Sequence, residues 1–182
     1  MGMYIMNASG RLINPFDLKK EDFDPRVIAQ TLSRICRFWA QTSEFYSVAQ
    51  HCLVMESLFE DPVLKKWALA HEIFEGLTGM DIPTPIKRQP YMASWREAEE
   101  KAIEKFASIH NLPYPVPPQI KEADKRLLVT EALRFMNSVN YDWEKQVGYS
   151  PYPLSIIGRP LEMKEAEIAF LTRWYELFSP CF

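Results

Sequence analysis

The segment WALAHEIFEGLTGMDIPTPIK, residues 67–87, decides how this chain folds. Asp61-Pro62 lies just ahead of it and supplies a helix cap followed by a first-turn proline, so a helix is predicted from there to about Leu77. Thr78-Gly79 ends that helix. The next stretch, MDIPTPIKRQP, contains three prolines and is predicted to be a loop.

Further helices are predicted on both sides of this segment. Asp24-Pro25 repeats the cap and proline, and apolar residues at helical spacing follow to about Cys36. Ser47 and Gln50 form the S-x-x-Q of a capping box, which starts a second helix that runs towards Phe59. Downstream helices are predicted over about residues 92–110, 119–139 and 161–178. The leader alternates apolar and polar residues around Ser9-Gly10, which predicts a short β-hairpin.

The chain length and composition are those of one globular domain. Its 182 residues suit a single all-α bundle, with 47% hydrophobic and 25% charged residues. We divide it into a leader (1–23), a core with the candidate site (24–139), and an aromatic loop with a closing helix (140–182). The net charge of −3 argues against binding to duplex nucleic acid.

The sequence also favours a cytoplasmic protein. No apolar run approaches the roughly 18 residues that cross a membrane, and no signal peptide is evident. Cys36, Cys52 and Cys181 are odd in number and lack Cys-x-x-Cys spacing, which argues against a disulfide framework or a zinc ribbon. Free thiols suit a reducing cytosol. Cys52 lies in an apolar run, so we interpret it as a core residue rather than a reactive thiol.

Two of the three histidines lie in the middle of predicted helices, beside carboxylates. His71 and Glu72 follow four apolar residues, and Glu75 lies one turn after His71 on the same face. His51 lies 20 residues before His71 on the preceding helix, and two helices joined by a short turn pack antiparallel, so the two rings can face each other. The helix over 119–139 can bring Asp124 to the same place.

This set of nitrogen and oxygen donors predicts a site for one divalent metal ion. Ligands without sulfur suit Mn, Co, Mg, Zn, Ni or Fe, and spacing does not choose among them. The alternative is structural: a histidine on an apolar helix is often a packing residue, and Glu72 and Glu75 would then lie at a solvated helix edge.

Three motifs resemble those of a known family. YSVAQHCLVM (46–55), ALAHEIFEGLTGMDIPTPIK (68–87) and KEADKRLLVTEA (121–132) are similar, in order and relative spacing, to the motifs of HD-domain metal-dependent phosphohydrolases. The resemblance extends over about residues 33–132. Its nearest branch is the small bacterial and phage 5′-deoxynucleotidases and deoxynucleoside triphosphohydrolases. It implies an HD-type helical bundle, a hydrolase acting on deoxynucleotides, and a homodimer or larger homo-oligomer.

The resemblance also implies a role for each residue at a matching position. His51, the His71-Glu72 doublet and Asp124 would be the metal ligands, and Glu75 would position or deprotonate the attacking water. The remaining matches would bind substrate: Arg37 and Lys87 the phosphate, Phe38 the nucleoside, and Asp81 the sugar. Without the resemblance, Arg37 would be equally well explained as a surface or helix C-terminal cation, and Lys87 would be better explained as a solvated loop charge.

The sequence departs from the family pattern at three places. The doublet is His-Glu where the family has His-Asp, Ala40-Gln41 stands where relatives often have Gly-His, and Met80 resembles a one-residue insertion. These departures leave a second hypothesis open, a catalytically impaired HD-domain protein that binds a nucleotide or a protein partner. A phosphodiesterase acting on another nucleotide is a further reading. The aromatic residues Trp143, Tyr149 and Tyr152 either cap a nucleobase pocket or fill core beneath the loop.

Overall fold

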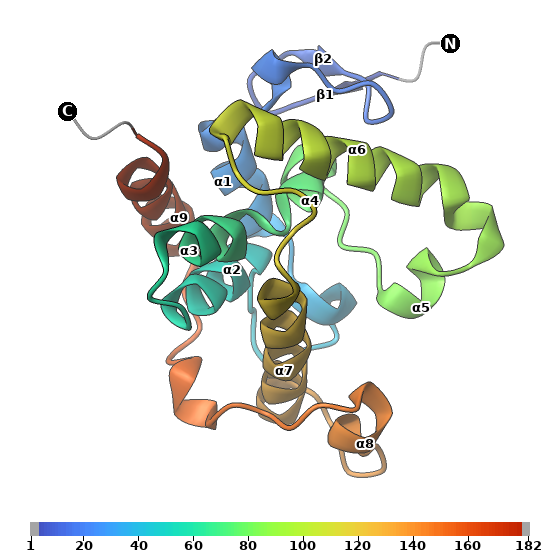
Figure 1. Ribbon diagram of the computed structural model, residues 1–182. Helices are drawn as coiled ribbons and strands as arrows, with labels where there is room; N and C mark the ends of the chain where they lie inside the picture. Colours follow the sequence, from blue (N-terminus) through green and yellow to red (C-terminus); the bar gives the residue numbers. More distant parts are fainter. Residues whose placement is uncertain (1–3, 180–182) are drawn as a thin grey trace.

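The computed structural model describes residues 4–179 (Figure 1). Its first three α-helices begin at polar caps that the sequence supplies. The Asp24 side chain accepts a hydrogen bond from the amide of Arg26, and Ser47 accepts one from the amide of Gln50. Asp61 accepts two hydrogen bonds from backbone amides in the first turn of its helix. Each cap satisfies amides that have no partner inside the helix.

The structure is an all-α domain with one small hairpin, as the sequence predicts. The longer helices are α1 (Pro25–Arg34), α2 (Val48–Ser57), α3 (Pro62–Ala70), α4 (Ile73–Thr78), α6 (Ala93–His110), α7 (Pro118–Phe135) and α9 (Met163–Phe178). Short helices are α5 (Thr84–Lys87) and α8 (Trp143–Val147), and 3-10 turns span Lys20–Asp22, Arg37–Ala40, Pro90–Met92 and Leu154–Ile156. The hairpin pairs β1 (Ile5–Met6) with β2 (Leu12–Ile13) in antiparallel register.

Five details differ from the sequence prediction. The helix predicted from Asp61 to Leu77 is broken into α3 and α4 at His71-Glu72. The predicted proline loop contains α5, and the stretch after α7 contains α8. Helix α7 ends at Phe135 because the next residue is extended. The Gln50 side chain does not complete a capping box; instead it bonds the backbone of Arg159 and Leu161, which ties the C-terminal segment to α2.

The core is continuous from the leader to the last helix. Helix α1 packs against α9 and α4, and α2 packs against α3, around buried side chains such as Trp67, Phe106 and Phe170. Gly76 lets α4 approach α1 closely, since a β-carbon there would lie 2.8 Å from the Ile28 side chain. Cys52 is fully buried, as expected for a core residue; Cys181 lies outside the described residues.

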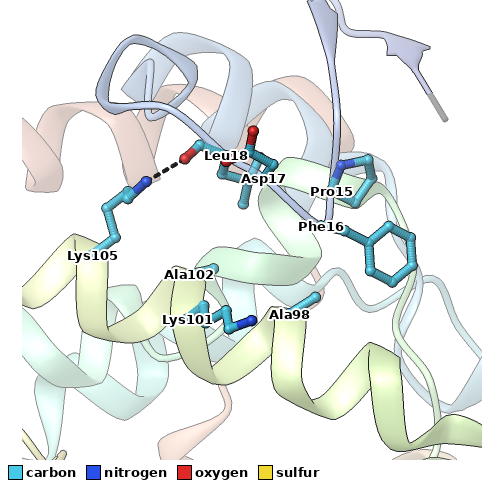
Figure 2. A pocket seen from close by; sticks show the side chains of 8 residues that line it. All are labelled: Pro15, Phe16, Asp17, Leu18, Ala98, Lys101, Ala102 and Lys105. Atoms are coloured by element: carbon cyan, nitrogen blue, oxygen red, sulfur yellow. Dashed lines mark hydrogen bonds between the residues drawn. The ribbon is translucent and has the colours of Figure 1, made fainter. Parts of the chain in front are cut away.

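The leader lies over helix α6. A cavity of about 70 Å³ separates residues 15–18 from one face of α6, and Lys105 crosses it to donate a hydrogen bond to the carbonyl of Leu18 (Figure 2). Ile13, Leu18 and Phe23 contribute to the main core. Across residues 4–179, every helix is too short or too polar to span a bilayer.

Candidate metal centre

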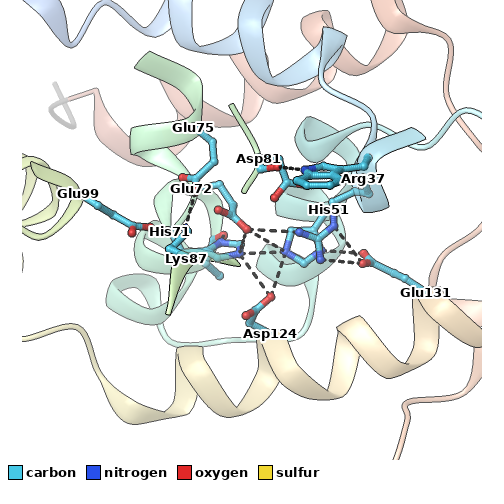
Figure 3. A network of polar contacts seen from close by, with 12 residues as sticks. Arg37, His51, His71, Glu72, Glu75, Asp81, Lys87, Glu99, Asp124 and Glu131 are labelled. Carbon is cyan, nitrogen blue, oxygen red and sulfur yellow. Dashed lines mark hydrogen bonds and ion pairs between the residues drawn. The ribbon is translucent and has the colours of Figure 1, made fainter. Parts of the chain in front are cut away.

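Four side chains from three parts of the fold converge on one point. His51 comes from α2, His71 and Glu72 from the break between α3 and α4, and Asp124 from α7. One donor atom of each lies within 4.8 Å of the donors of the other three, so the group could hold a metal ion (Figure 3). The structure thus brings together all four residues that the sequence predicted as ligands.

The break in the helix explains how two adjacent residues serve one site. In a continuous helix, the His71 and Glu72 side chains would diverge by about 100°. Here the helix ends at Ala70, and Glu72 has φ −98° and ψ 30°. The His71 ring turns back so that its Nδ1 bonds the carbonyl of Ala68 at 2.6 Å. As a result, Glu72 Oε1 lies 3.7 Å from His71 Nε2.

Hydrogen bonding fixes which nitrogen of each ring faces the site. A carbonyl oxygen only accepts, so His71 Nδ1 carries the hydrogen that bonds Ala68. Nδ1 of His51 lies 2.7 Å from Oε1 of Glu131, a carboxylate, and donates in the same way. In each neutral ring the Nε2 lone pair therefore points into the site, which is the arrangement that metal-binding histidines adopt.

The two Nε2 atoms are 2.9 Å apart. Two lone pairs at this distance repel each other unless a cation or a proton lies between them. Two nitrogens bound to one ion at about 2.1 Å and roughly at right angles would lie about 3 Å apart. Asp124 Oδ1 lies 3.4 Å from His51 Nε2 and 4.0 Å from His71 Nε2. The donor set fits one divalent ion.

The charges around the site also favour a dication. Glu72 and Glu131 pair with one buried guanidinium, that of Arg37, and Asp124 lies against His51, so the three carboxylates call for further positive charge, which a metal ion or a proton on His51 can supply. Burial and Arg37 lower the pKa of His51, but Glu131 and Asp124 raise it more, to about 9. Burial lowers the pKa of His71. Burial raises the pKa of Asp124, but the hydrogen bond and charge of His51 hold it well below its ordinary value.

Arg37 borders the ligand group. Its side chain is 8% exposed, and Nη1 lies 3.4 Å from Glu72 Oε1 while Nη2 lies 3.1 Å from Glu131 Oε2. Burial disfavours its charge, yet Glu131, Asp81 and Glu72 together raise the pKa of the guanidinium above its ordinary range. Arg37 therefore stays charged, as a phosphate-binding residue must.

Glu75 and Lys87 form a second cluster beside the ligands. Lys87 Nζ lies 3.0 Å from Glu75 Oε1 and 2.7 Å from Glu99 Oε1. Glu75 is buried, and among the described residues its Oε2 finds no hydrogen-bond partner. Burial and the charge of Glu72 raise its pKa well above the ordinary value. A buried carboxyl of this kind is suited to taking up a proton.

The remaining predicted substrate residues lie around Arg37. Its guanidinium carbon is 5.6 Å from the centre of the Phe38 ring, and Trp143 of α8 meets that ring edge-to-face at 6.0 Å. The indole of Trp39 donates a hydrogen bond to the carbonyl of Asp81, so the loop after α4 is held beside the Arg37–Ala40 turn. Of the three aromatic residues left open, Trp143 thus lies at this edge, while Tyr149 and Tyr152 cover Lys125 and Arg126 of α7.

Two glutamates of the site were not singled out from the sequence. Glu131 bonds both His51 and Arg37, and Glu99 bonds Lys87. The signal for Glu131 was its spacing, since it lies seven residues after Asp124 and thus two turns along the same face of α7. Glu99 lies in a run of charged residues on α6 that gives no such signal.

The fold and the site define an all-α domain with a partly buried group of two histidines and two carboxylates that could hold a metal ion. No protein-family model matches the chain. The uncharacterized protein YfdR of Escherichia coli (strain K12) is 34% identical over 128 residues, which make up 70% of this chain and 70% of that protein. The chain belongs to the family of YfdR.

Proposed function

We propose that this protein is a metal-dependent phosphohydrolase of the HD-domain type that acts on deoxynucleotides, at a 5′-monophosphate or a triphosphate. The observation that carries the proposal is the convergence of His51, His71, Glu72 and Asp124 beside a buried arginine. A dication held by these four residues, with a phosphate-binding cation at its edge, is what hydrolysis of a phosphate ester requires.

Each residue then has a distinct task. A divalent ion bound by the four ligands would supply Lewis acidity and an activated water. Arg37 would neutralise charge on the phosphate, because its Nη1 lies 3.4 Å from the ligand Glu72. Glu75, a buried carboxyl whose pKa is raised, would take the proton of the attacking water. Asp124 is 36% exposed, so the site opens towards solvent on the α7 side.

The test is a metal and substrate panel. The purified protein is analysed for bound metal, and then assayed with Mn, Co, Mg, Zn, Ni or Fe for product release from deoxynucleoside mono-, di- and triphosphates and from the matching ribonucleotides. We expect about one ion per chain and hydrolysis of deoxynucleotides. Release of phosphate or of triphosphate identifies the scissile bond. Absence of both metal binding and hydrolysis would refute the proposal.

A second candidate is a catalytically impaired HD-domain protein that binds a nucleotide or a protein partner. The two cations expected to bind phosphate are already paired with carboxylates, which favours this candidate because a phosphate would have to compete with them. Arg37 contacts Glu72 and Glu131, and Lys87 contacts Glu75 and Glu99. Calorimetry separates the two candidates. Nucleotide binding in the presence of metal, without product release over the whole panel, would support the second.

Two further expectations belong to the same proposal. We place the protein in the cytoplasm, because the thiols of Cys36 and Cys52 are free and deoxynucleotides occur there. We also expect a homodimer or larger homo-oligomer, which analytical ultracentrifugation of the purified protein tests directly.

A further inference from the structure

We infer that Glu131 is a positioning residue that links the metal centre to Arg37. Its side chain is fully buried on α7, and its two oxygens have different partners. Oε1 accepts from His51 Nδ1 at 2.7 Å, and Oε2 accepts from the Arg37 guanidinium, at 3.3 Å from Nε and 3.1 Å from Nη2. The inference rests on the proposed function, since it assigns a role within that site.

The division of the two oxygens argues against a purely structural ion pair. A buried carboxylate that only neutralised an arginine would gain most by placing one oxygen on each branch of the guanidinium. Glu131 instead uses Oε1 for a neighbouring histidine. Its other oxygen accepts two N–H groups of Arg37, a side chain that is always protonated, and this pairing suits a carboxylate. A charged acceptor is therefore held at the outer nitrogen of one predicted ligand.

The contact with His51 has a definite consequence for the metal. A carboxylate at Nδ1 holds the ring in the tautomer whose Nε2 lone pair is free, and it makes that nitrogen a stronger donor. The same contact fixes the plane of the fully buried His51 ring. Loss of such an outer contact typically weakens metal binding by about 10- to 100-fold.

The contact with Arg37 connects the metal ligands to the cation that is expected to bind phosphate. Arg37 Nη1 reaches Glu72, itself a predicted ligand, while Nε and Nη2 are held by Glu131. One carboxylate therefore sets the position of a ligand and of the cation expected to bind phosphate. Removing it should affect metal affinity and phosphate affinity together.

Glutamine cannot replace this residue. Arg37 only donates, so the amide oxygen of a glutamine would have to face it. The amide NH2 would then face His51 Nδ1 and force the opposite tautomer, with the hydrogen on Nε2 inside the site. If the amide turned the other way, two donors would meet at Arg37. Either arrangement weakens the metal centre while the size of the side chain is preserved.

The test compares Glu131→Gln with a matched control. Glu56→Gln changes another buried glutamate, on α2, whose partners, Arg173 and Lys65, lie outside the site. Calorimetry with Mn²⁺ measures metal affinity for the parent and both variants, and inorganic phosphate is then titrated into the metal-loaded proteins. We expect Glu131→Gln to weaken Mn²⁺ binding by about 10- to 100-fold and phosphate binding as well, and Glu56→Gln to change neither.

The outcomes separate this inference from the proposed function. A parent protein that binds no metal overturns both. A parent that binds Mn²⁺, with Glu131→Gln within twofold of it or Glu56→Gln equally weakened, overturns only the inference. If Glu131→Gln fails to fold, the ¹⁵N chemical shifts of His51 in the zinc-loaded parent protein test the inference, because they show which ring nitrogen carries the hydrogen. A hydrogen on Nδ1 is expected, and a hydrogen on Nε2 would overturn the assignment.

Discussion

His51 and His71 face each other through their Nε2 atoms at 2.9 Å, and each ring is anchored from behind by its Nδ1. The acceptors behind them differ: a carboxylate for His51 and a backbone carbonyl for His71. Both acceptors keep the Nε2 lone pair directed inward. The 2.9 Å between the two Nε2 atoms suits a metal ion bound by both rings, and it equally suits a hydrogen bond from a protonated His51 to His71, so analysis of bound metal decides between the two interpretations.

His71→Ala should abolish metal binding and hydrolysis while leaving the helical circular dichroism signal largely unchanged. The variant loses a ligand at the centre of the group, whereas α3 and α4 keep their buried faces. The measurements are calorimetry with Mn²⁺, product release, and the far-ultraviolet spectrum. The matched control is His110→Ala, which changes a histidine of α6 that packs against Phe106 and Phe178. Normal turnover by His71→Ala would show that His71 is a packing residue and not a metal ligand.

Ala40→Gly should stabilise the protein by about 0.5–1 kcal/mol. Phe38, Trp39 and Ala40 have φ of 53°, 54° and 58°, a left-handed conformation that costs residues with a β-carbon about 1–2 kcal/mol each. Glycine at position 40 removes this cost. Part of the gain is lost, because glycine has more conformational freedom in the unfolded chain. The measurement is the midpoint of urea unfolding. Ala93→Gly is the control, since this exposed alanine begins α6 with ordinary φ and its change should destabilise.

The left-handed turn gives a physical reason for the glycine that the HD-domain pattern, which the sequence resembles, often has at the position of Ala40. A φ of 58° is one that glycine adopts without strain. The sequence alone could show that the residue differs. It could not show that the backbone keeps the left-handed conformation despite the alanine.

Much of the helical fold could be predicted because its signals are local. Asp24-Pro25, Ser47 and Asp61-Pro62 each mark a helix start within a few residues, and all three caps are formed. The break at His71-Glu72 could not be predicted, because the apolar pattern continues through it. At the break, the His71 ring bonds the carbonyl of Ala68, and the Glu72 side chain turns towards the other ligands.

The candidate site likewise contains residues that the sequence could predict and residues that it could not. The four ligands could be proposed from residue type, spacing and resemblance, since all of these are properties of the chain. Glu99 could not, because its importance comes from Lys87, 12 residues away on another helix. The spacing of Glu131 from Asp124 indicated the right face of α7, but its partner His51, 80 residues away, is visible only in the structure. The pairing of Arg37 and Lys87 with glutamates is likewise visible only once distant helices are packed together.

His110 should make the protein less stable as pH falls from about 6.5 to 4. Burial and the charges of Lys66 and Lys20 lower the pKa of this imidazole from its ordinary value of 6.5 to about 4. The unfolded chain therefore binds a proton in this window more readily than the folded chain does, and protons favour unfolding. His110→Gln should lose less stability between neutral and acid pH than the parent. Urea unfolding at several pH values tests this, and an NMR titration of His110 with a midpoint at or above 6.5 would contradict it.

The last prediction separates Glu72 from Glu75. Glu72 lies within the ligand group and contacts Arg37, whereas Glu75 is buried against Lys87 with one oxygen unpartnered among the described residues. Glu75→Gln keeps shape and removes the base, so it should cut turnover by about 10²–10⁴-fold with metal affinity close to normal. Glu72→Gln should instead weaken metal binding, because a neutral amide is a poorer ligand than a carboxylate.

A metal titration of turnover distinguishes the two roles. Excess metal should restore part of the activity lost in Glu72→Gln, because mass action refills a weakened site. It should restore none of the activity lost in Glu75→Gln, because no concentration of metal replaces a missing base. If excess metal rescued Glu75→Gln but not Glu72→Gln, Glu75 would be the metal ligand and Glu72 the base. If both variants matched the parent, the group that binds the metal and the group that accepts the proton would have to be sought elsewhere in the chain.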